Sequence, residues 1–356
     1  MKKLRIGIIG CGGVANGHIR GVLDSRDLEI SALCDIVPER LAEKVSAYGI
    51  AGDLCYDNHI SLMESGKVDA VSICTPNNAH FHIAMDAIKR GIPYAVEKPA
   101  GMNEAEVAQM LAATEGKSLA NMVCFSYRFV SAARFMRDIV KSGELGRLFH
   151  IGGDYLQAGG IPGTRDGESA PLVWRFVKGI AASGALGDLG CHMIDLMRFI
   201  TGREFTYVNA DMDTFINRRR LLDGDGYGVV DVDDYISVTG QMEDQLASNM
   251  FISRYAYGRG NYQRVEIYGE KGALRYYLDG KGSLEINIGS KAMREGHVWA
   301  EIPVPPKYDS AQMQSFADVV NGCGDGLAAS IHDGLAVQRV LDAALLAAES
   351  GNRVRL

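Results

Sequence analysis

Side chains that can exchange protons or bind hydroxyl groups recur in one short stretch of the chain. In the stretch GALGDLGCHMIDLMRFI (184–200), Asp188, His192 and Asp195 fall within about 60° of arc if the residues form a helix. Most other positions are apolar, as in a buried helix. Imidazole suits a general base because its pKa lies near neutral pH. A catalytic role and a satisfied core histidine are both open interpretations of His192 at this point.

A glycine-rich turn near the N-terminus predicts a nucleotide site. GCGGVA (10–15) has the pattern G-x-G-x-x-A, and it stands between a predicted strand, 4–9, and a predicted helix, 14–23. Gly10 permits the tight turn, and Gly12 lets the backbone approach a pyrophosphate beside the N–H groups of the helix. Asp35 ends the second predicted strand, where a carboxylate binds ribose hydroxyls and repels a 2′-phosphate. We therefore expect NAD rather than NADP, although Arg40 leaves dual use open.

Composition excludes several classes of partner. The chain has 356 residues and a net charge of −7, so it lacks the basic character of nucleic-acid-binding proteins. No run approaches the roughly 18 apolar residues of a membrane span, and no signal peptide is evident. The seven cysteines lack a pairing pattern and indicate reduced thiols, so we expect a cytoplasmic protein. The basic run 218–220 is interpreted as a solvated loop.

The hydrophobic pattern changes near residue 126. Before it, strands alternate with helices, which predicts an α/β Rossmann domain with a doubly wound parallel sheet; its predicted strands are 4–9, 28–35, 68–75, 93–97 and 119–125. Beyond it, strand signals predominate and predict an α+β domain with a large, mostly antiparallel sheet; these strands are 148–155, 235–239, 246–255, 263–268, 273–278 and 283–288. The expected domains are 1–126 and 127–308, with C-terminal helices in 309–356 packing back towards the first domain.

Further segments turn this general pattern into a recognisable one. TPNNAH (75–80) follows the third predicted strand, EKP (97–99) follows the fourth, and GDLGCHMID (187–195) lies in the stretch described first. With the glycine-rich turn, YRF (127–129) and WR (174–175), their order resembles the Gfo/Idh/MocA family of NAD(P)-dependent sugar and cyclitol dehydrogenases over essentially the whole chain. The resemblance implies a Rossmann domain beside a sheet domain, with the active site between them.

The resemblance also implies roles for single residues. Lys98 matches the family's catalytic lysine, His192 its acid/base and Asp188 its substrate-side carboxylate, whereas Asp195 matches a structural position. The Lys98–Pro99 bond matches one that is cis in the family. Together with the turn, the expected cofactor-binding residues are Gly10, Gly12, Gly13, Val14, Asp35, Arg40, Thr75, Pro76, Asn77, His80, Glu97 and Lys98.

The expected substrate-binding residues come partly from the resemblance and partly from residue type. Polar and aromatic side chains in the long connection before 184 suit sugar hydroxyls and ring faces, and they suit an oligomer interface equally. With the family positions, the set is Tyr127, Arg128, Arg165, Asp166, Trp174, Arg175, Asp188 and His192. His192, Asp195 and Asp188 also have metal-binding side chains, but no second histidine or cysteine pair lies at ligand spacing, and we expect no metal.

These observations predict an NAD-dependent enzyme that oxidises a secondary hydroxyl of a sugar, anhydrosugar or cyclitol, or that runs in reverse. One alternative is a glycosidase that oxidises its substrate transiently and returns the hydride. Another is a non-catalytic NAD-binding regulatory protein, against which the presence of both Lys98 and His192 argues. We expect a small-molecule sugar or polyol as substrate and a homodimer or homotetramer formed through an exposed sheet face.

Overall fold

The chain folds into two compact units. The computed structural model describes residues 2–161, 171–289, 291 and 295–356. Unit 1 comprises Met1–Phe125 and Ser310–Gln338, and unit 2 comprises Ser126–Asp309 and Arg339–Leu356. The C-terminal segment 309–356, expected to pack on the first domain, is thus divided: the chain passes from unit 1 to unit 2 within helix α11 (Ile331–Ser350).

Unit 1 is built on a parallel sheet. Among the described residues its strand order is β3-β2-β1-β4-β5-β6, and every neighbouring pair is parallel. The central strand β4 is buried throughout, as expected of a strand covered on both faces. The two-residue β3 is absent from the sequence prediction. The strands are β1 (Leu4–Ile9), β2 (Leu28–Cys34), β3 (Cys55–Tyr56), β4 (Ala70–Ile73), β5 (Tyr94–Val96) and β6 (Asn121–Val123).

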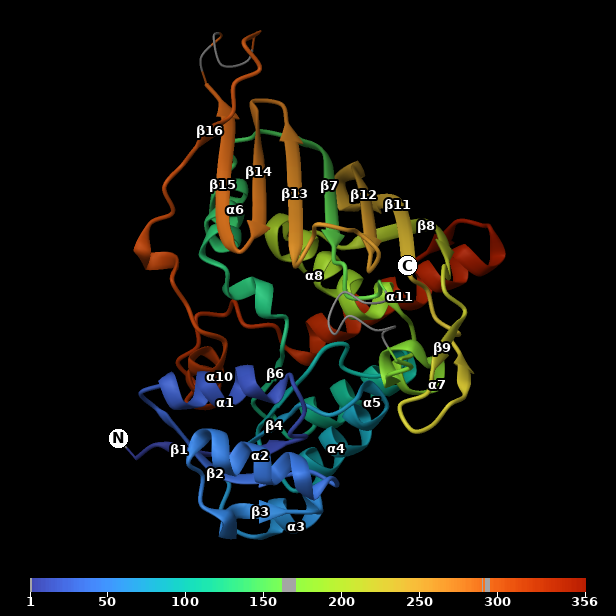
Figure 1. The fold of residues 1–356 in the computed structure, drawn as a ribbon. Helices are drawn as coiled ribbons and strands as arrows, with labels where there is room; N and C mark the ends of the chain where they lie inside the picture. Colours follow the sequence, from blue (N-terminus) through green and yellow to red (C-terminus); the bar gives the residue numbers. More distant parts are fainter. Residues whose placement is uncertain (1, 162–170, 290, 292–294) are drawn as a thin grey trace. The chain divides into compact units, whose positions relative to one another are not determined.

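Helices cover this sheet, and the returning chain completes its edge (Figure 1). The backbone N–H of Val123 in β6 donates to the carbonyl of Ala329 at 2.8 Å, and Asn121 Oδ1 accepts from the N–H of Ile331, also at 2.8 Å. The later segment is therefore an integral part of unit 1. Its helices are α1 (Ala15–Asp24), α2 (Pro38–Tyr48), η1 (Gly52–Leu54), α3 (His59–Glu64), α4 (Asn77–Lys89), α5 (Glu104–Glu115), α10 (Gln312–Val320) and the start of α11.

Unit 2 is built on a larger sheet, with the order β16-β15-β14-β13-β7-β12-β11-β8-β17. Its neighbouring strands are antiparallel except β7 and β12, which are parallel. The large, mostly antiparallel sheet is confirmed, but the strands β8, β16 and β17 were not predicted. The strands are β7 (Leu148–Leu156), β8 (Phe205–Asp213), β11 (Tyr235–Met242), β12 (Leu246–Ser253), β13 (Tyr262–Gly269), β14 (Gly272–Asp279), β15 (Lys281–Ile288), β16 (Ala300–Glu301) and β17 (Val354–Arg355).

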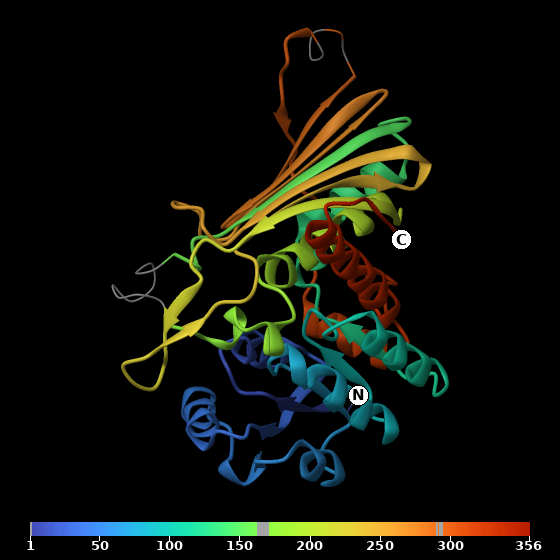
Figure 2. The same cartoon turned by 90° about the vertical axis from the view of Figure 1, so that its right-hand side faces the viewer.

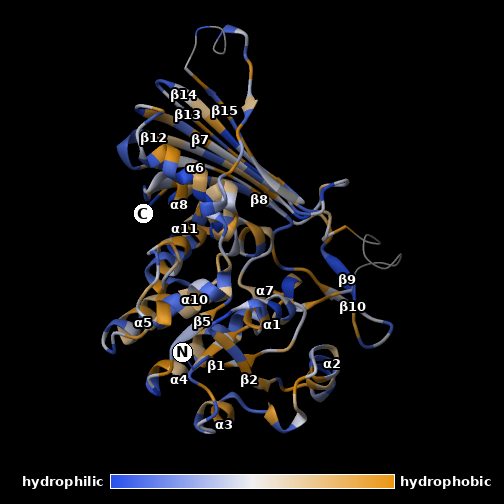
Figure 3. Ribbon diagram, turned by 90° about the vertical axis from the view of Figure 1, so that its left-hand side faces the viewer, coloured by the Kyte–Doolittle hydropathy of each residue, from blue (hydrophilic) through white to orange (hydrophobic). Residues whose placement is uncertain are grey.

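Helices lie against one face of the large sheet and leave the other face open (Figure 2). Burial alternates along β12, which explains the mixture of hydrophobic and hydrophilic residues on these strands (Figure 3). Gly153 in β7 leaves room for α8, because a Cβ there would lie 2.5 Å from the sulfur of Met193. The helices of unit 2 are η2 (Ser126–Phe129), α6 (Ser131–Lys141), η3 (Trp174–Phe176), α7 (Lys178–Ala181), η4 (Leu186–Gly190), α8 (Cys191–Thr201), η5 (Glu243–Gln245), η6 (Pro306–Tyr308) and the end of α11.

The basic run 218–220 is not a solvated loop. It forms strand β9 (Arg218–Arg220), which pairs with β10 (Tyr227–Val229). The side chain of Arg219 is buried, donates to the carbonyl of Gly160 and lies over the ring of Phe176 at 4.0 Å. Its partners, the Phe176 ring and the Gly160 carbonyl, are remote in sequence. The charge pattern alone therefore predicted a solvent-exposed side chain where the structure has a buried one. No described helix is both long and apolar enough to cross a membrane.

Candidate functional site

In unit 1 the predicted cofactor motifs follow neighbouring strands. Gly10 follows β1, Asp35 follows β2, Thr75 comes shortly after β4, and Glu97 follows β5. The strands are parallel neighbours in the order β2-β1-β4-β5, so their carboxyl ends lie at one edge of the sheet. The strand order reverses between β1 and β4, and dinucleotides bind at such a switch point in α/β sheets.

The glycine-rich turn fits a pyrophosphate. Gly10 has φ +89°, and a Cβ there would lie 2.7 Å from the carbonyl carbon of Cys74, so only glycine is accommodated. Around Gly12 and Gly13, in contrast, no atom lies within 4 Å of an added Cβ. Val14, at the N-terminus of α1, is partly exposed. The turn therefore leaves open space where backbone N–H groups at a helix N-terminus attract phosphate oxygens.

Asp35 is held in place by the backbone around it. One carboxylate oxygen accepts from the N–H of Cys11 at 2.7 Å, and the other accepts from the N–H of Val37 at 2.9 Å. The Arg40 guanidinium lies 3.7 Å from Asp35 and is half exposed. A carboxylate has about four acceptor positions, so two bonds leave capacity for ribose hydroxyls. The orientation fits the expected adenosine side of the cofactor.

The segment after β4 is tied to the segment after β5. One ring nitrogen of His80 lies 2.8 Å from the carbonyl oxygen of Pro99, and the other lies 2.9 Å from that of Thr75. Burial lowers the pKa of His80, and its ring lies between the two backbones. The hydroxyl oxygen of Thr75 is buried with no hydrogen-bond partner among the described residues, as expected of a group that awaits a ligand. Pro76 and the buried Asn77 begin α4.

Glu97 lies between the predicted catalytic lysine and a residue that the sequence analysis missed. The Lys98–Pro99 bond is cis, as predicted. One carboxylate oxygen of Glu97 accepts from the N–H of Lys98 at 3.2 Å, and the other lies 2.9 Å from Nε2 of His18. His18 is on α1, 79 residues before Glu97, and only the folded sheet brings the two together. The nearest sequence signal is that His18 falls on the buried face of that helix.

In unit 2 the helix carrying His192 begins with a π-helical turn. Residues Leu186–Gly190 form this turn and α8 continues from Cys191, whereas the sequence indicated one regular helix. Such turns are frequent at functional sites. Asp233, which was not predicted, supports the turn: its carboxylate accepts from the N–H groups of Gly184 at 2.5 Å and Leu186 at 2.7 Å, and its carbonyl accepts from Ala185 at 2.9 Å. Burial raises the pKa of Asp233.

Asp188, Trp174 and Arg175, three of the expected substrate-binding residues, lie together in unit 2. The Nε atom of Arg175 lies 3.7 Å from a carboxylate oxygen of Asp188. The Arg175 guanidinium also lies 4.3 Å from the centre of the Trp174 ring. These side chains combine a charge pair with an aromatic face, which suits a sugar. Arg165 and Asp166 lie outside the described residues.

His192 is buried beside two tyrosines. The Tyr127 ring meets it edge-on at 4.7 Å between ring centres, and the Tyr155 ring lies at 6.3 Å. The two phenol oxygens are 2.5 Å apart, and each lies within hydrogen-bond distance of Oδ1 of Asn261. Burial, with the neighbouring Tyr127, raises the pKa of Tyr155, so its hydroxyl stays protonated. Tyr155 and Asn261 were missed because the strand pattern alone does not distinguish them from core residues.

Arg128, predicted to bind substrate, is engaged elsewhere. Its guanidinium donates to the Asp195 carboxylate at 2.8 Å and 2.6 Å, a two-pronged ion pair with both side chains buried. The structure therefore gives Arg128 an anchoring position that links η2 to α8. The pair also accounts for the carboxylate of Asp195 on a helix that is buried along its whole length.

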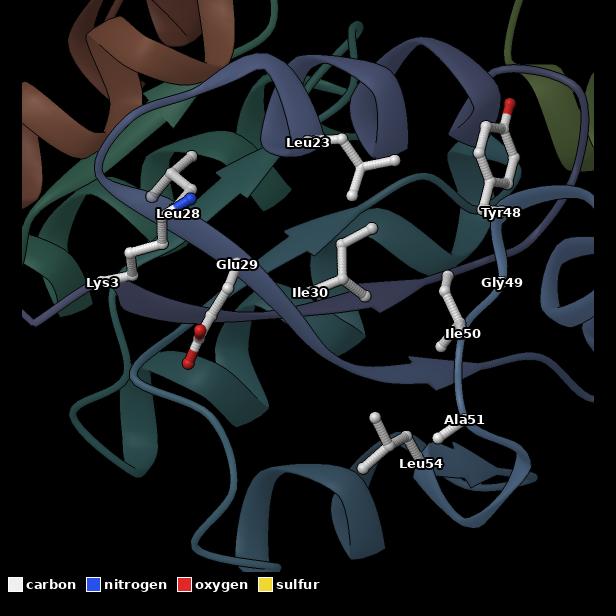
Figure 4. A pocket seen from close by; sticks show the side chains of 10 residues that line it. All are labelled: Lys3, Leu23, Leu28, Glu29, Ile30, Tyr48, Gly49, Ile50, Ala51 and Leu54. Atoms are coloured by element: carbon white, nitrogen blue, oxygen red, sulfur yellow. The ribbon is translucent and has the colours of Figure 1, made fainter.

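Unit 1 contains two further features, a groove and a cluster of possible metal-ligating atoms. A groove of about 290 Å³ in unit 1 contains none of the predicted site residues; Figure 4 shows its lining, which is Lys3, Leu23, Leu28, Glu29, Ile30, Tyr48, Gly49, Ile50, Ala51 and Leu54. The possible ligand atoms of His18, Glu97 and Cys124 lie within 4.8 Å of one another. Both ring nitrogens of His18 already have partners, so the group is an internal cluster and not an open metal site.

Comparison with known proteins matches both units. The model of the oxidoreductase family with an NAD-binding Rossmann fold matches residues 4–125, and the GFO/IDH/MocA C-terminal domain model matches residues 133–275. Levoglucosan dehydrogenase of Pseudarthrobacter phenanthrenivorans is 30% identical over 83% of this chain and 79% of its own length. Inositol 2-dehydrogenase of Rhizobium meliloti is 26% identical over 96% of each chain.

Solved structures give the same result. A levoglucosan dehydrogenase in complex with NADH and L-sorbose superposes with a TM-score of 0.89 and 26% identity, covering 99% of this chain and 98% of that one. The complex of levoglucosan dehydrogenase with NADH and levoglucosan also gives a TM-score of 0.89 and 26% identity, covering 99% of both chains. The likeness therefore extends over both units.

Proposed function

The chain is an NAD-binding oxidoreductase that belongs to the GFO/IDH/MocA family, and we propose that it transfers a hydride between NAD and a secondary hydroxyl of a sugar, anhydrosugar or cyclitol. The relatives named above act on levoglucosan and on inositol, both of which are rich in hydroxyl groups. The residue roles and the substrate class below are part of this proposal.

The observation that carries the proposal is the surroundings of His192. An imidazole is flanked by two phenols and an amide that share hydrogen bonds, and its helix carries Asp188 beside Arg175. Recognition of a sugar needs several donors and acceptors in fixed positions, with an aromatic face against its apolar side. Unit 2 supplies both kinds of surface within one short helix and the segments that contact it.

Each catalytic residue has one task in the proposed reaction. NAD, when bound, accepts the hydride from the carbon that carries the hydroxyl. His192 accepts the hydroxyl proton, and the ammonium group of Lys98 stabilises the negative charge that develops on the oxygen. Asp188 accepts a hydrogen bond from a second hydroxyl of the substrate and so fixes which carbon reacts. In the reverse direction His192 returns the proton.

A screen of NAD reduction over sugars, anhydrosugars and cyclitols tests this function. With an active substrate, Lys98→Ala and His192→Ala should each lower kcat by about 10²- to 10⁴-fold, because each removes a group that acts on the transferred proton or the developing charge. Isothermal titration should find NADH affinity much less affected. Lys89→Ala, on the exposed surface of α4, is the matched control.

Near-wild-type kcat in either active-site variant would remove that residue from the mechanism. NADH binding with no reduction of NAD across the panel would contradict the dehydrogenase function. Hydrolysis of glycosides without net formation of NADH would then indicate the redox-assisted glycosidase. Absence of both NAD reduction and glycoside hydrolysis would indicate the regulatory protein.

We also propose that Asp35 makes the enzyme prefer NAD to NADP. Its buried carboxylate is fixed by the N–H groups of Cys11 and Val37, so it cannot swing away from a 2′-phosphate. Asp35→Ser should lower the ratio of kcat/KM for NAD to that for NADP by at least tenfold, measured with one substrate. An unchanged ratio would contradict the assignment.

A homo-oligomer formed through the open face of the large sheet is the third part of the proposal. Phe251 in β12 is 41% exposed, and it alternates with the buried Met250 and Ile252. It therefore lies on the open face of the sheet, opposite the helices (Figure 2). A second copy of the chain would cover this apolar surface. Phe251→Lys should lower the mass measured by light scattering, and a monomeric wild-type protein would contradict this part.

A further inference from the structure

A pair of titratable side chains, one buried and one largely buried, lies behind the predicted nicotinamide half of the cofactor site. His18 is 4% exposed, and its Nε2 atom lies 2.9 Å from the Glu97 carboxylate. Its other ring nitrogen lies 2.8 Å from the hydroxyl of Ser72 in β4. The second carboxylate oxygen of Glu97 accepts from the N–H of Lys98. His18 therefore reaches the catalytic segment through Glu97 alone and is a positioning residue, not a catalytic one.

Other groups around the pair do not replace His18 as the partner of this carboxylate. Burial raises the pKa of the Cys124 thiol, which therefore stays neutral near Glu97. The imidazole of His80 lies between two backbone carbonyls, and burial lowers its pKa. Cys74, in contact with Ser72, and Lys98, whose backbone N–H binds Glu97, are further titratable residues beside the pair. The protonation state of His18 thus sets whether the His18–Glu97 pair is neutral or carries one negative charge.

The pKa of His18 is raised in the unliganded protein, so its imidazole binds the proton of the pair tightly. Burial lowers the pKa of His18, but the charge and hydrogen bonds of Cys74 and Glu97 outweigh this and hold it well above its usual value. A second positive charge brought close to a buried imidazolium opposes that proton, because charges interact strongly where water is excluded. The nicotinamide ring is positively charged in NAD⁺ and neutral in NADH.

We propose that the His18–Glu97 pair makes the cofactor site discriminate between oxidised and reduced cofactor, with loss of its proton favouring NAD⁺. The inference rests on the proposed assignment of Glu97 and Lys98 to the nicotinamide half of the site. When the pair loses the proton, its net negative charge attracts the cationic ring. By linkage, NAD⁺ weakens the hold of His18 on its proton to the same extent. Oxidation of an alcohol also releases a proton, so NAD⁺ binding and the forward reaction are favoured over the same pH range.

Binding measurements with each cofactor test the inference without a substrate. Dissociation constants for NAD⁺ and NADH are measured by isothermal titration between pH 6 and 9.5. In the wild-type protein the preference for NAD⁺ over NADH should rise with pH by about 5- to 20-fold. His18→Asn keeps a donor for Glu97 but cannot titrate, so its preference should be constant over this range.

His59→Asn is the matched control, because His59 also pairs with a carboxylate of unit 1, Asp86, at 3.1 Å. It should keep the wild-type pH dependence. If His18→Asn fails to fold, the imidazole nitrogen shifts of His18 in the wild-type protein decide instead: NAD⁺ should lower its pKa, and NADH should not.

The outcomes separate the inference from the function on which it rests. A pH dependence in His18→Asn equal to that of the wild type, or a His18 pKa insensitive to NAD⁺, would overturn the inference alone. Failure of both cofactors to bind would overturn the cofactor assignment and the inference with it.

Discussion

Each unit buries one ion pair next to its predicted catalytic residues, and the two pairs differ in kind. In unit 1, Glu97 precedes Lys98 and faces the imidazole of His18. In unit 2, Asp195 lies one helical turn after His192 and faces the guanidinium of Arg128 at 2.6 Å. A guanidinium stays charged at every pH that proteins tolerate, whereas an imidazole gains and loses its proton near neutrality.

The type of cation therefore gives the two carboxylates different roles. Asp195 and Arg128 form a permanent anchor, because two parallel hydrogen bonds fix both position and orientation. Glu97 accepts from the backbone N–H of Lys98 and contacts the imidazole of His18, so the charge of this pair changes with pH. An anchor suits the unit that we propose to hold the hydroxyls of the substrate in place. A titrating pair suits the unit that binds a cofactor whose charge changes during the reaction.

The largest expected effect comes from breaking the anchor. Asp195→Asn leaves the buried Arg128 charge without its counter-charge and should lower the free energy of unfolding by about 3–5 kcal/mol. Urea denaturation measures this. Asp244→Asn is the control, since Asp244 pairs with Arg203 at the surface, and should change stability by less than about 1 kcal/mol. Equal effects of the two variants would show that Asp195 is not an anchor.

A smaller effect is expected at Asp233, whose buried carboxylate is bound by backbone N–H groups. Asp233→Asn turns one acceptor into a donor, so the N–H of Gly184 or Leu186 loses its partner. The cost should be about 1–3 kcal/mol in the same denaturation experiment. The π-turn before His192 should also loosen and lower kcat more than NADH affinity. Unchanged stability and kcat would mean that the turn does not depend on this carboxylate.

The titrating pair should make stability depend on pH where the anchor does not. The pKa of His18 is raised in the folded protein, so the folded state binds this proton more tightly than the unfolded state does. The stabilisation is complete below the unfolded value near 6.5 and is lost as pH rises through the folded value. Thermal unfolding should show a falling midpoint above neutral pH and a weaker fall in His18→Asn. Parallel curves would contradict the pair's contribution.

The smallest effect concerns the cysteine thiols. Burial raises the pKa of Cys11 and of Cys34 to about 12, and it also raises that of Cys124. These thiols should therefore react slowly with a disulfide reagent at pH 8, while the exposed Cys323 reacts quickly. Colorimetric titration should find one fast thiol in the native protein and none in Cys323→Ser. A fast reaction that persists in that variant would contradict the low reactivity expected of the other thiols.

The parts of the fold predicted from sequence are those with a local cause. Gly10, Asp35, Thr75 and Glu97 each end a buried apolar run, and parallel pairing necessarily brings such ends to one edge. The cis bond before Pro99 followed from the family motif. In contrast, β3 and β17 have two residues each, too few for any alternation to show.

The parts missed depend on partners far away in the chain. His18 meets Glu97 across 79 residues, and Gly184 meets Asp233 across 49. Neither His18 nor Asp233 belongs to a motif that names its partner. The prediction of a solvated environment for Arg219 was wrong for a related reason. A run of three arginines is usually solvated, and the packed ring of Phe176 explains why the middle one is buried.

The pairing of β7 with strands much later in the chain delays the completion of unit 2 during synthesis. β7 leaves the ribosome about a hundred residues before its neighbours β12 and β13, and until then its edges have no strand to pair with. β17, at residues 354–355, joins β8 later still, and unit 1 waits for Ala329 to pair with Val123. A nascent chain that ends before Ala329 lacks the last partners of both sheets. Its unpaired strand edges are prone to aggregation, from which chaperones protect such chains.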